Sequence, residues 1–469
     1  MKAKEAGMLG SRVHDRIRPH IADKAFYKRA LSVMMPIMAQ QLITTVVNLV
    51  DNLQVGQLGS QSIAGVGIAN QFFFIYSLML FGIAGGGGIF VAQFWGARDN
   101  DGMKQSYRFM LITSFFVSIL FMLLAYFGAP KIIGFFTQDP GTISEGVSYL
   151  RVVLFTFTPT AFSISTAGSF RSIGHAKVAM LPSIVAVFVN MVFNYILIFG
   201  KFGAPRLGVE GAAYATVLAR IVELIMLYYA MRRDTCPFRS SISHMFKVKP
   251  VLFKTILVKS LPLIANELLW STGVTMQFKA YSTRGVVALA ALNIMNAVNN
   301  MFFVVVSGQA TAISVIIGHA LGADHLVEAR RDSRRLILFG IMISGCMLLL
   351  HIGCGLTIPS IYNVTAEVRA TARLLTSLSA VMMPIYLTNA SFFFVLRSGG
   401  DTKSVMLMDS LFTWFITVPY ALSIAYFTKV TLLQLFLLVQ VTEFVKLAIA
   451  YTLFRKERWV RNLTTGANR

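Results

Sequence analysis

Long apolar stretches, separated by short polar and charged loops, are the dominant pattern of this 469-residue sequence. A helix needs about 20 apolar residues to cross the ~30 Å hydrocarbon core of a bilayer. Twelve stretches satisfy that requirement, and each predicts one membrane-spanning helix. They cover residues 30–54, 62–95, 109–134, 146–168, 178–200, 208–231, 255–278, 286–320, 336–360, 371–395, 405–427 and 430–453.

The second stretch is too long for one straight span. It contains four successive glycines at positions 85–88. Because glycine tolerates many backbone conformations, we expect the helix to bend or unwind there. The run lacks the lysine of a phosphate-binding loop, so helix packing or hinging is the favoured interpretation.

Composition agrees with a membrane protein. Hydrophobic residues make up 56% and charged residues 13%, whereas a soluble domain carries about 25% charged residues. A soluble enzyme, a disordered chain and a disulfide-stapled secreted chain are thereby excluded. A formal net charge of +22 could indicate a nucleic-acid partner only on a soluble fold with a basic patch. Here the charges lie between apolar runs, so no nucleic-acid partner is expected.

The basic residues predict the orientation. With the N-terminus in the cytoplasm, 31 Lys and Arg fall on the cytoplasmic side and 8 on the opposite side. The positive-inside rule therefore places both termini in the cytoplasm, where the basic loops contact anionic membrane lipids. The predicted divisions are a basic arm (1–29), an N-lobe (30–231), a linker (232–254), a C-lobe (255–455) and a basic tail (456–469).

The two halves of the chain repeat at a constant offset of 226 residues. Pro36 matches Pro262, residues 64–70 match 290–296, and residues 170–177 match 396–403. Each half holds six spans, an even number, so the repeats are parallel and related by an axis along the membrane normal. The predicted fold is an all-α polytopic membrane protein of two six-helix bundles around a central cavity, typical of transporters.

Acidic residues inside the spans require an explanation, because each costs about 2.5–3.5 kcal/mol on insertion scales. Asp51 and Glu267 have no basic residue one turn away, so they are candidate cation sites. Asp409, at the start of its span, is either functional or a helix cap. Two pairs spaced i, i+3 are interpreted as structural ion pairs. These are Arg220 with Glu223 and Glu443 with Lys446.

Amides and hydroxyls accompany these acids. Asn190 and Asn194 are one helical turn apart, and Thr216 lies in the next span. Oxygen ligands of this kind suit Na⁺, and a lone carboxylate can carry H⁺ instead; hydrogen bonding between helices is the alternative interpretation. Further candidates for a substrate cavity are Gln41, Asn48, Asn70, Asn296, Tyr386, Asn389 and Asp409.

Several short motifs resemble the multidrug and toxic compound extrusion (MATE) family, over about residues 28–460. They are residues 50–56 (VDNLQVG), 63–67 (IAGVG), 93–97 (QFWGA), 170–174 (FRSIG), 190–195 (NMVFNY) and 396–401 (LRSGGD). The resemblance implies a cation site at Asp51, Asn190, Asn194 and Thr216, and a role for Glu267 in the C-lobe. Many relatives also have an acid in span ten, where this chain offers Tyr386 and Asn389.

The resemblance implies a secondary active antiporter that exports small organic cations in exchange for Na⁺ or H⁺. It also implies a monomer in a bacterial inner membrane, with no cofactor beyond the coupling ion. The alternative is a flippase for lipid-linked oligosaccharides, which should carry basic residues in its central spans. A membrane transferase is disfavoured because no metal, nucleophile or catalytic triad is visible, and a receptor scaffold is disfavoured by the repeat.

Overall fold

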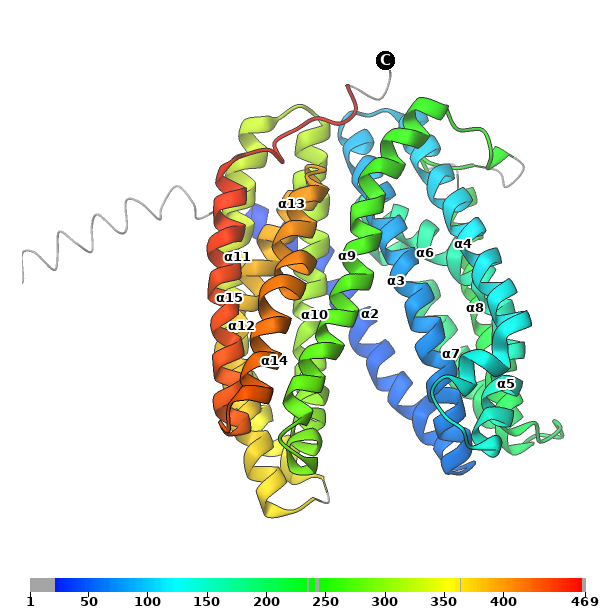
Figure 1. The fold of residues 1–469 in the computed structure, drawn as a ribbon. Coiled ribbons are helices and arrows are strands. Elements are labelled where there is room, and N and C mark those ends of the chain that lie inside the picture. The colour runs from blue at the N-terminus through cyan, green and yellow to red at the C-terminus, as the bar shows by residue number, and fades with distance from the viewer. Residues whose placement is uncertain (1–21, 234–235, 241–243, 363, 466–469) are drawn as a thin grey trace, which may run out of the picture. The chain divides into compact units, whose positions relative to one another are not determined.

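The computed structural model describes residues 22–233, 236–240, 244–362 and 364–465, so most of the predicted basic arm and the end of the tail lie outside the described residues. All regular structure in the described part of the chain is helical. The helices are α2 (Lys24–Gly56), α3 (Ser60–Gly96), α4 (Asn100–Gly134), α5 (Pro140–Val153), η2 (Leu154–Thr156), α6 (Phe157–Ser172), α7 (Ala176–Phe199), α8 (Gly208–Arg232), α9 (Pro250–Ser282), α10 (Val286–Gly322), α11 (Leu326–Thr357), η4 (Ile358–Ser360), α12 (Ala366–Ser398), α13 (Thr402–Met406), η5 (Leu407–Leu411), η6 (Thr413–Thr417), α14 (Val418–Phe427) and α15 (Leu432–Arg455) (Figure 1).

These elements confirm the predicted all-α membrane fold. Eleven helical stretches of the described residues are long and apolar enough to cross a membrane, and α9 is a twelfth helix of 33 residues. The stretch from α5 to α6 forms one span, and the stretch from α13 to α14 forms another. The repeat is visible in the bounds: α2 and α9 start at residues 24 and 250, and α3 and α10 at residues 60 and 286.

The chain divides into two compact units whose boundaries fall inside helices. Among the described residues, one unit comprises Pro36–Leu269 with 463–465, and the other comprises Trp270–Asn462 with 22–35. The boundaries therefore cut α2 between Met35 and Pro36, a proline inside the helix. They cut α9 between Leu269 and Trp270. Each of these two helices contributes to both units.

Glycines in α3 allow the first half of α9 to pack very closely against it within the first unit. A β-carbon added at Gly82 would lie 2.7 Å from the Cα of Ile264, and one added at Gly86 would overlap the side chain of Ser260. The helix does not unwind at residues 85–88, since α3 is one continuous helix of 37 residues. The glycines serve packing instead.

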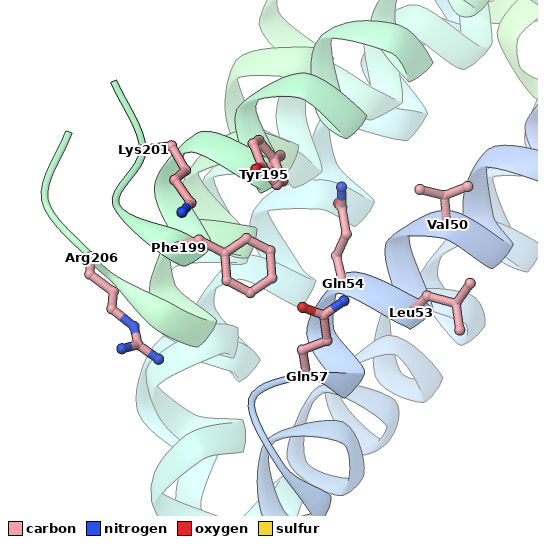
Figure 2. A pocket seen from close by; sticks show the side chains of 8 residues that line it. All are labelled: Val50, Leu53, Gln54, Gln57, Tyr195, Phe199, Lys201 and Arg206. Atoms are coloured by element: carbon pink, nitrogen blue, oxygen red, sulfur yellow. The ribbon is translucent and has the colours of Figure 1, made fainter. Parts of the chain in front are cut away.

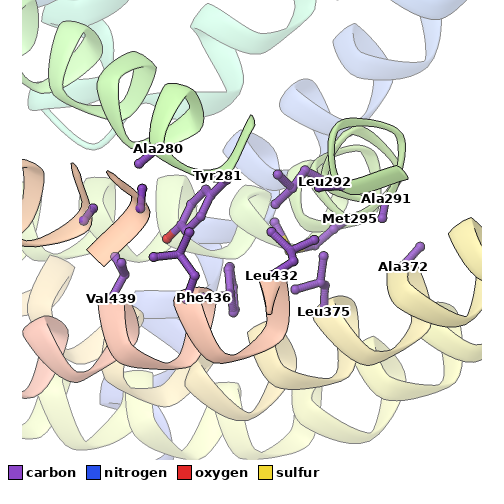
Figure 3. Close-up of a cluster of buried hydrophobic side chains, with 14 of the residues drawn as sticks. Ala280, Tyr281, Ala291, Leu292, Met295, Ala372, Leu375, Leu432, Phe436 and Val439 are labelled. Carbon is purple, nitrogen blue, oxygen red and sulfur yellow. The ribbon is translucent and has the colours of Figure 1, made fainter. Parts of the chain in front are cut away.

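The other unit is built around a cluster of buried apolar side chains (Figure 3). The end of α9 contributes Tyr281, α12 contributes Leu375, and α15 contributes Phe436. Tyr281 and Phe436 place their ring centroids 5.8 Å apart, a favourable aromatic separation. Residues 22–35 join the same unit through Tyr27, whose ring lies 4.9 Å from that of Phe339.

Candidate functional site

The structure gathers the four residues of the predicted cation site from three helices of the first unit. The Asn194 amide on α7 donates to the carboxylate of Asp51 on α2 and also to Oδ1 of Asn190, at 3.4 Å. Asn190 Nδ2 in turn lies 3.2 Å from Thr216 Oγ1 on α8. A continuous hydrogen-bond chain therefore runs from Asp51 to Thr216 and includes all four residues that the resemblance assigns to a cation site.

The chemistry of this chain suits a hard cation or a proton. Asn194 is fully buried, and its Oδ1 atom has no hydrogen-bond partner in the described structure. An unpartnered buried carbonyl oxygen beside a carboxylate is a ligand that Na⁺ can use. Among the described residues there is no group of three or more His, Cys, Asp or Glu side chains that could hold a metal ion. A transition-metal centre therefore has no visible ligand set there.

Next to this site lies a structural ion pair. Arg220 Nη1 is 2.6 Å from Glu223 Oε2 on the same helix, which confirms the predicted i, i+3 pairing. Ser183 on α7 donates to the other oxygen of Glu223 at 2.7 Å. The carboxylate of Glu223 thus has partners for both oxygens and ties α7 to α8.

In the other unit, the predicted pairing of Glu443 with Lys446 is wrong. Lys446 instead contacts Asp409, with Nζ 2.6 Å from Oδ1, and Glu443 accepts a hydrogen bond from Asn389 at 2.9 Å. Asp409 lies in the π-helical segment η5, inside the span Thr402–Phe427. The interpretation of Asp409 as a helix cap is also wrong, because Asp401 caps the helix by accepting from the backbone of Ser404.

The remaining candidates are spread over the chain. Tyr386 donates to Gln440, while Asn70 accepts from Tyr149 at 3.4 Å. Gln41, Asn48 and Asn296 are exposed in the structure. Glu267 lies before Leu269 on α9, so it belongs to the same compact unit as Asp51, although the resemblance placed it in the C-lobe.

A cavity of about 610 Å³ opens beside the cation site, within the range of about 300–1,000 Å³ usual for small-molecule pockets (Figure 2). It is lined by Val50, Leu53, Gln54, Gln57, Tyr195, Phe199, Lys201 and Arg206. The sequence reasoning missed these residues. The signal was present, because Gln54 follows Asp51 by one helical turn and Tyr195 follows Asn194 directly.

Comparison with known families identifies the chain. The MatE family model matches residues 36–196 and again residues 262–426, which together make up more than half of the chain. The chain belongs to the MatE family. The two matches begin 226 residues apart, so the family model detects the same internal repeat as the sequence.

Relatives of this MatE protein cover most of its length. A protein of Bacillus subtilis (strain 168), described as the uncharacterized transporter YisQ, is 23% identical over 444 residues, covering 94% of this chain and 96% of the relative. A protein of Agrobacterium fabrum, described as the probable multidrug resistance protein NorM, is 26% identical over 340 residues, covering 71% of this chain and 69% of the relative.

Solved structures share the fold of this MatE chain. One shows the outward-facing conformation of a multidrug resistance MATE family transporter of the MOP superfamily, with a TM-score of 0.84 and 20% identity over 94% of this chain and 97% of that one. Another shows a MATE protein in the bent conformation, with a TM-score of 0.84 and 19% identity over 97% and 99% of the two chains. The resemblance from the motifs is thereby confirmed, and the protein is a multi-pass membrane protein.

Proposed function

We propose that this protein is a secondary active multidrug exporter that expels organic cations in exchange for inward Na⁺ or H⁺. One observation carries the proposal: the carboxylate of Asp51 lies inside a membrane-spanning helix and is held by the buried amide of Asn194. An acidic residue at that depth is costly, and it marks an ion pathway by default. Relatives described as probable multidrug resistance proteins support the choice of cargo.

Coupling follows if ion and drug stabilise different conformations of the cavity, since a ligand shifts an equilibrium only through differential affinity. The ion arrives down its gradient, and each unit charge moving inward supplies about 2.3 kcal/mol per 100 mV. Asp51, Asn190, Asn194 and Thr216 would form the coupling site. The charge asymmetry of the loops supports cytoplasmic termini. The bacterial origin of the relatives supports a location in a bacterial inner membrane.

The test uses purified protein in liposomes and ethidium as a fluorescent organic cation. Transport is followed under an imposed Na⁺ gradient and, separately, under a pH gradient. Asp51→Asn removes the charge with little change in shape, and Glu210→Gln is the control, because Glu210 is exposed in the first turn of α8. We expect one gradient to drive transport, Asp51→Asn to abolish that response, and Glu210→Gln to preserve it. Transport indifferent to both gradients would contradict antiport and favour the flippase.

A further inference from the structure

The cavity beside the cation site combines two walls of different chemistry. One wall is the end of α2, with Val50, Leu53, Gln54 and Gln57, and the other is the end of α7 with the loop that follows it (Figure 2). The second wall presents the rings of Tyr195 and Phe199 together with the cationic side chains of Lys201 and Arg206. Apolar and aromatic lining with a few polar groups is the usual composition of a small-molecule site.

Lys201 and Arg206 both lie in the short loop after α7, and the conformation of this loop places both at the cavity. Gly200 adopts a left-handed conformation with φ of 66°, and its missing β-carbon would lie 2.9 Å from Cβ of Arg206. Only glycine accepts this combination readily, because it has no β-carbon. The loop is also tied back to α7, since the backbone N–H of Leu207 donates to the carbonyl of Leu197 at 2.9 Å. Arg206 is therefore held close to the C-terminal end of α7, and Lys201 follows that end directly after Gly200.

The positive charge of this cavity is not neutralised by an acidic residue of its lining. Its lining contains two cations and no carboxylate. Neither Lys201 nor Arg206 has a side-chain ion pair or hydrogen bond with any residue that the structure describes. The C-terminal dipole of α7 favours cations at this place, by about 0.3–1 kcal/mol each, but it does not require a cavity. Two uncompensated cations beside aromatic rings are complementary to a ring that carries an acid group.

Two residues that line the cavity are sequence neighbours of cation-site residues. Val50 directly precedes Asp51, and Tyr195 directly follows Asn194. Gln54 spans the two walls, because its Nε2 atom lies 3.4 Å from the carbonyl of Met191 on α7. Its Oε1 atom is buried without a hydrogen-bond partner in the described structure. A ligand here would contact residues adjacent in sequence to both Asp51 and Asn194.

We propose that this cavity binds a small aromatic organic anion, with its acid group on Lys201 and Arg206 and its ring against Phe199 and Tyr195. The compounds handled by the protein then include acids and zwitterions in addition to cations. This role in export rests on the proposed function, but the binding itself does not require an ion gradient. An exposed cation contributes only modestly to the free energy of binding an anion. We therefore expect Lys201 and Arg206 together to change the affinity about tenfold.

The test measures binding to purified full-length protein in phosphatidylcholine nanodiscs, with three probes that share one ring system. 1-Naphthoate is anionic, 1-naphthamide is neutral, and 1-naphthylmethylammonium is cationic. We expect naphthoate to bind at least about tenfold more tightly than the cation. The variant Lys201→Gln/Arg206→Gln should lose about tenfold in naphthoate affinity and leave naphthamide binding unchanged. The matched control Lys131→Gln/Lys429→Gln removes two exposed cations that do not line the cavity, and it should bind like the wild type.

Equal affinity for all three probes, or unchanged naphthoate binding in the Lys201→Gln/Arg206→Gln variant, would overturn the proposal. A second variant, Phe199→Ala, should weaken all three probes, because it removes ring contact and not charge. Adding phosphatidylglycerol to the nanodiscs distinguishes a lipid headgroup: if it displaces naphthoate, the cavity is a lipid site and the proposal is wrong. A failure of gradient-driven ethidium transport would leave these binding results unaffected, so the two proposals can fail separately.

Discussion

Lys446 on α15 and Asp409 in η5 form an ion pair with a 2.6 Å separation, and each side chain is only 12% exposed. Both charges are therefore largely removed from water, and removing either residue takes a direct ion-pair partner from the other. The π-helical geometry of η5 carries Asp409 well inside the span, 37 residues before its partner in the sequence. The pair fixes this irregular segment to α15.

Breaking the pair should therefore destabilise the protein more than removing both charges. Lys446→Met leaves Asp409 buried without its cation, and we expect a loss of about 3–5 kcal/mol. Lys446→Met/Asp409→Leu should recover most of that loss, because the carboxylate that contacted Lys446 is removed as well. Thermal unfolding in detergent of the wild type, the single variant and the double variant measures the order of their stabilities. A double variant as unstable as the single one would show that the buried charge of Asp409 is not the cause of the loss.

The close packing of α3 on α9 predicts a position-specific effect of alanine. Gly86→Ala places a methyl group on the side chain of Ser260, and overpacking of this kind costs about 1–3 kcal/mol. Gly67 lies in the same helix with nothing within 4 Å of an added β-carbon, so Gly67→Ala should be neutral or slightly stabilising. Melting temperatures of both variants provide the comparison. Equal melting temperatures would mean that α9 does not pack as described.

The amide of Asn194 should determine the affinity for the coupling ion. A hydrogen bond to a charged group is worth about 1.5–3 kcal/mol, so Asn194→Ala should raise the half-saturating ion concentration at least about tenfold. Asn389→Ala is the matched control, because Asn389 is also a buried amide but belongs to the other compact unit. The measurement is ethidium export against Na⁺ or H⁺ concentration. A larger effect of Asn389→Ala would move the coupling site to that unit.

The stability of the first turn of α5 should depend on pH, because Asp139 caps this helix at its N-terminus. It caps α5 by accepting from the Oγ1 and backbone N of Thr142, both at 2.7 Å, and these bonds lower the pKa of its carboxyl group. Because the pKa is lowered, the ionised Asp139 contributes its full stabilisation of the helix start above the ordinary carboxyl pKa of about 3.9. This stabilisation is lost as the pH falls through the pKa of Asp139 in the folded protein.

Amide exchange at Thr142, corrected for intrinsic rates, should therefore accelerate in acid. Asp139→Asn keeps a capping oxygen that does not titrate in this range, so its protection at Thr142 should not vary with pH. Protection that changes equally with pH in both proteins would exclude Asp139 as the responsible group.

The sequence predicted the spans because length and apolarity are local properties that a bilayer requires directly. It predicted the partnership of Asp51, Asn194 and Thr216 through the motifs. It did not predict the contact of Lys446 with Asp409, because the i, i+3 spacing from Glu443 offered a simpler partner. The sequence also did not predict that Lys201 and Arg206 line one cavity. Counting basic residues on one side of the membrane does not show that the chain turns at Gly200 and that both residues then line the same cavity.

The division of α9 has a consequence for biosynthesis. The unit that contains Asp51 takes its last membrane helix from Pro250–Leu269, whose Ser260 and Ile264 fill the hollows at Gly86 and Gly82. A chain emerging from the ribosome therefore cannot complete this unit when its first six spans have been made. The surface of α3 at Gly82 and Gly86 is therefore not covered by α9 until residues near 260 enter the membrane. Residues 22–35 remain without their contact to Phe339 for longer, because Phe339 is synthesised later in the chain.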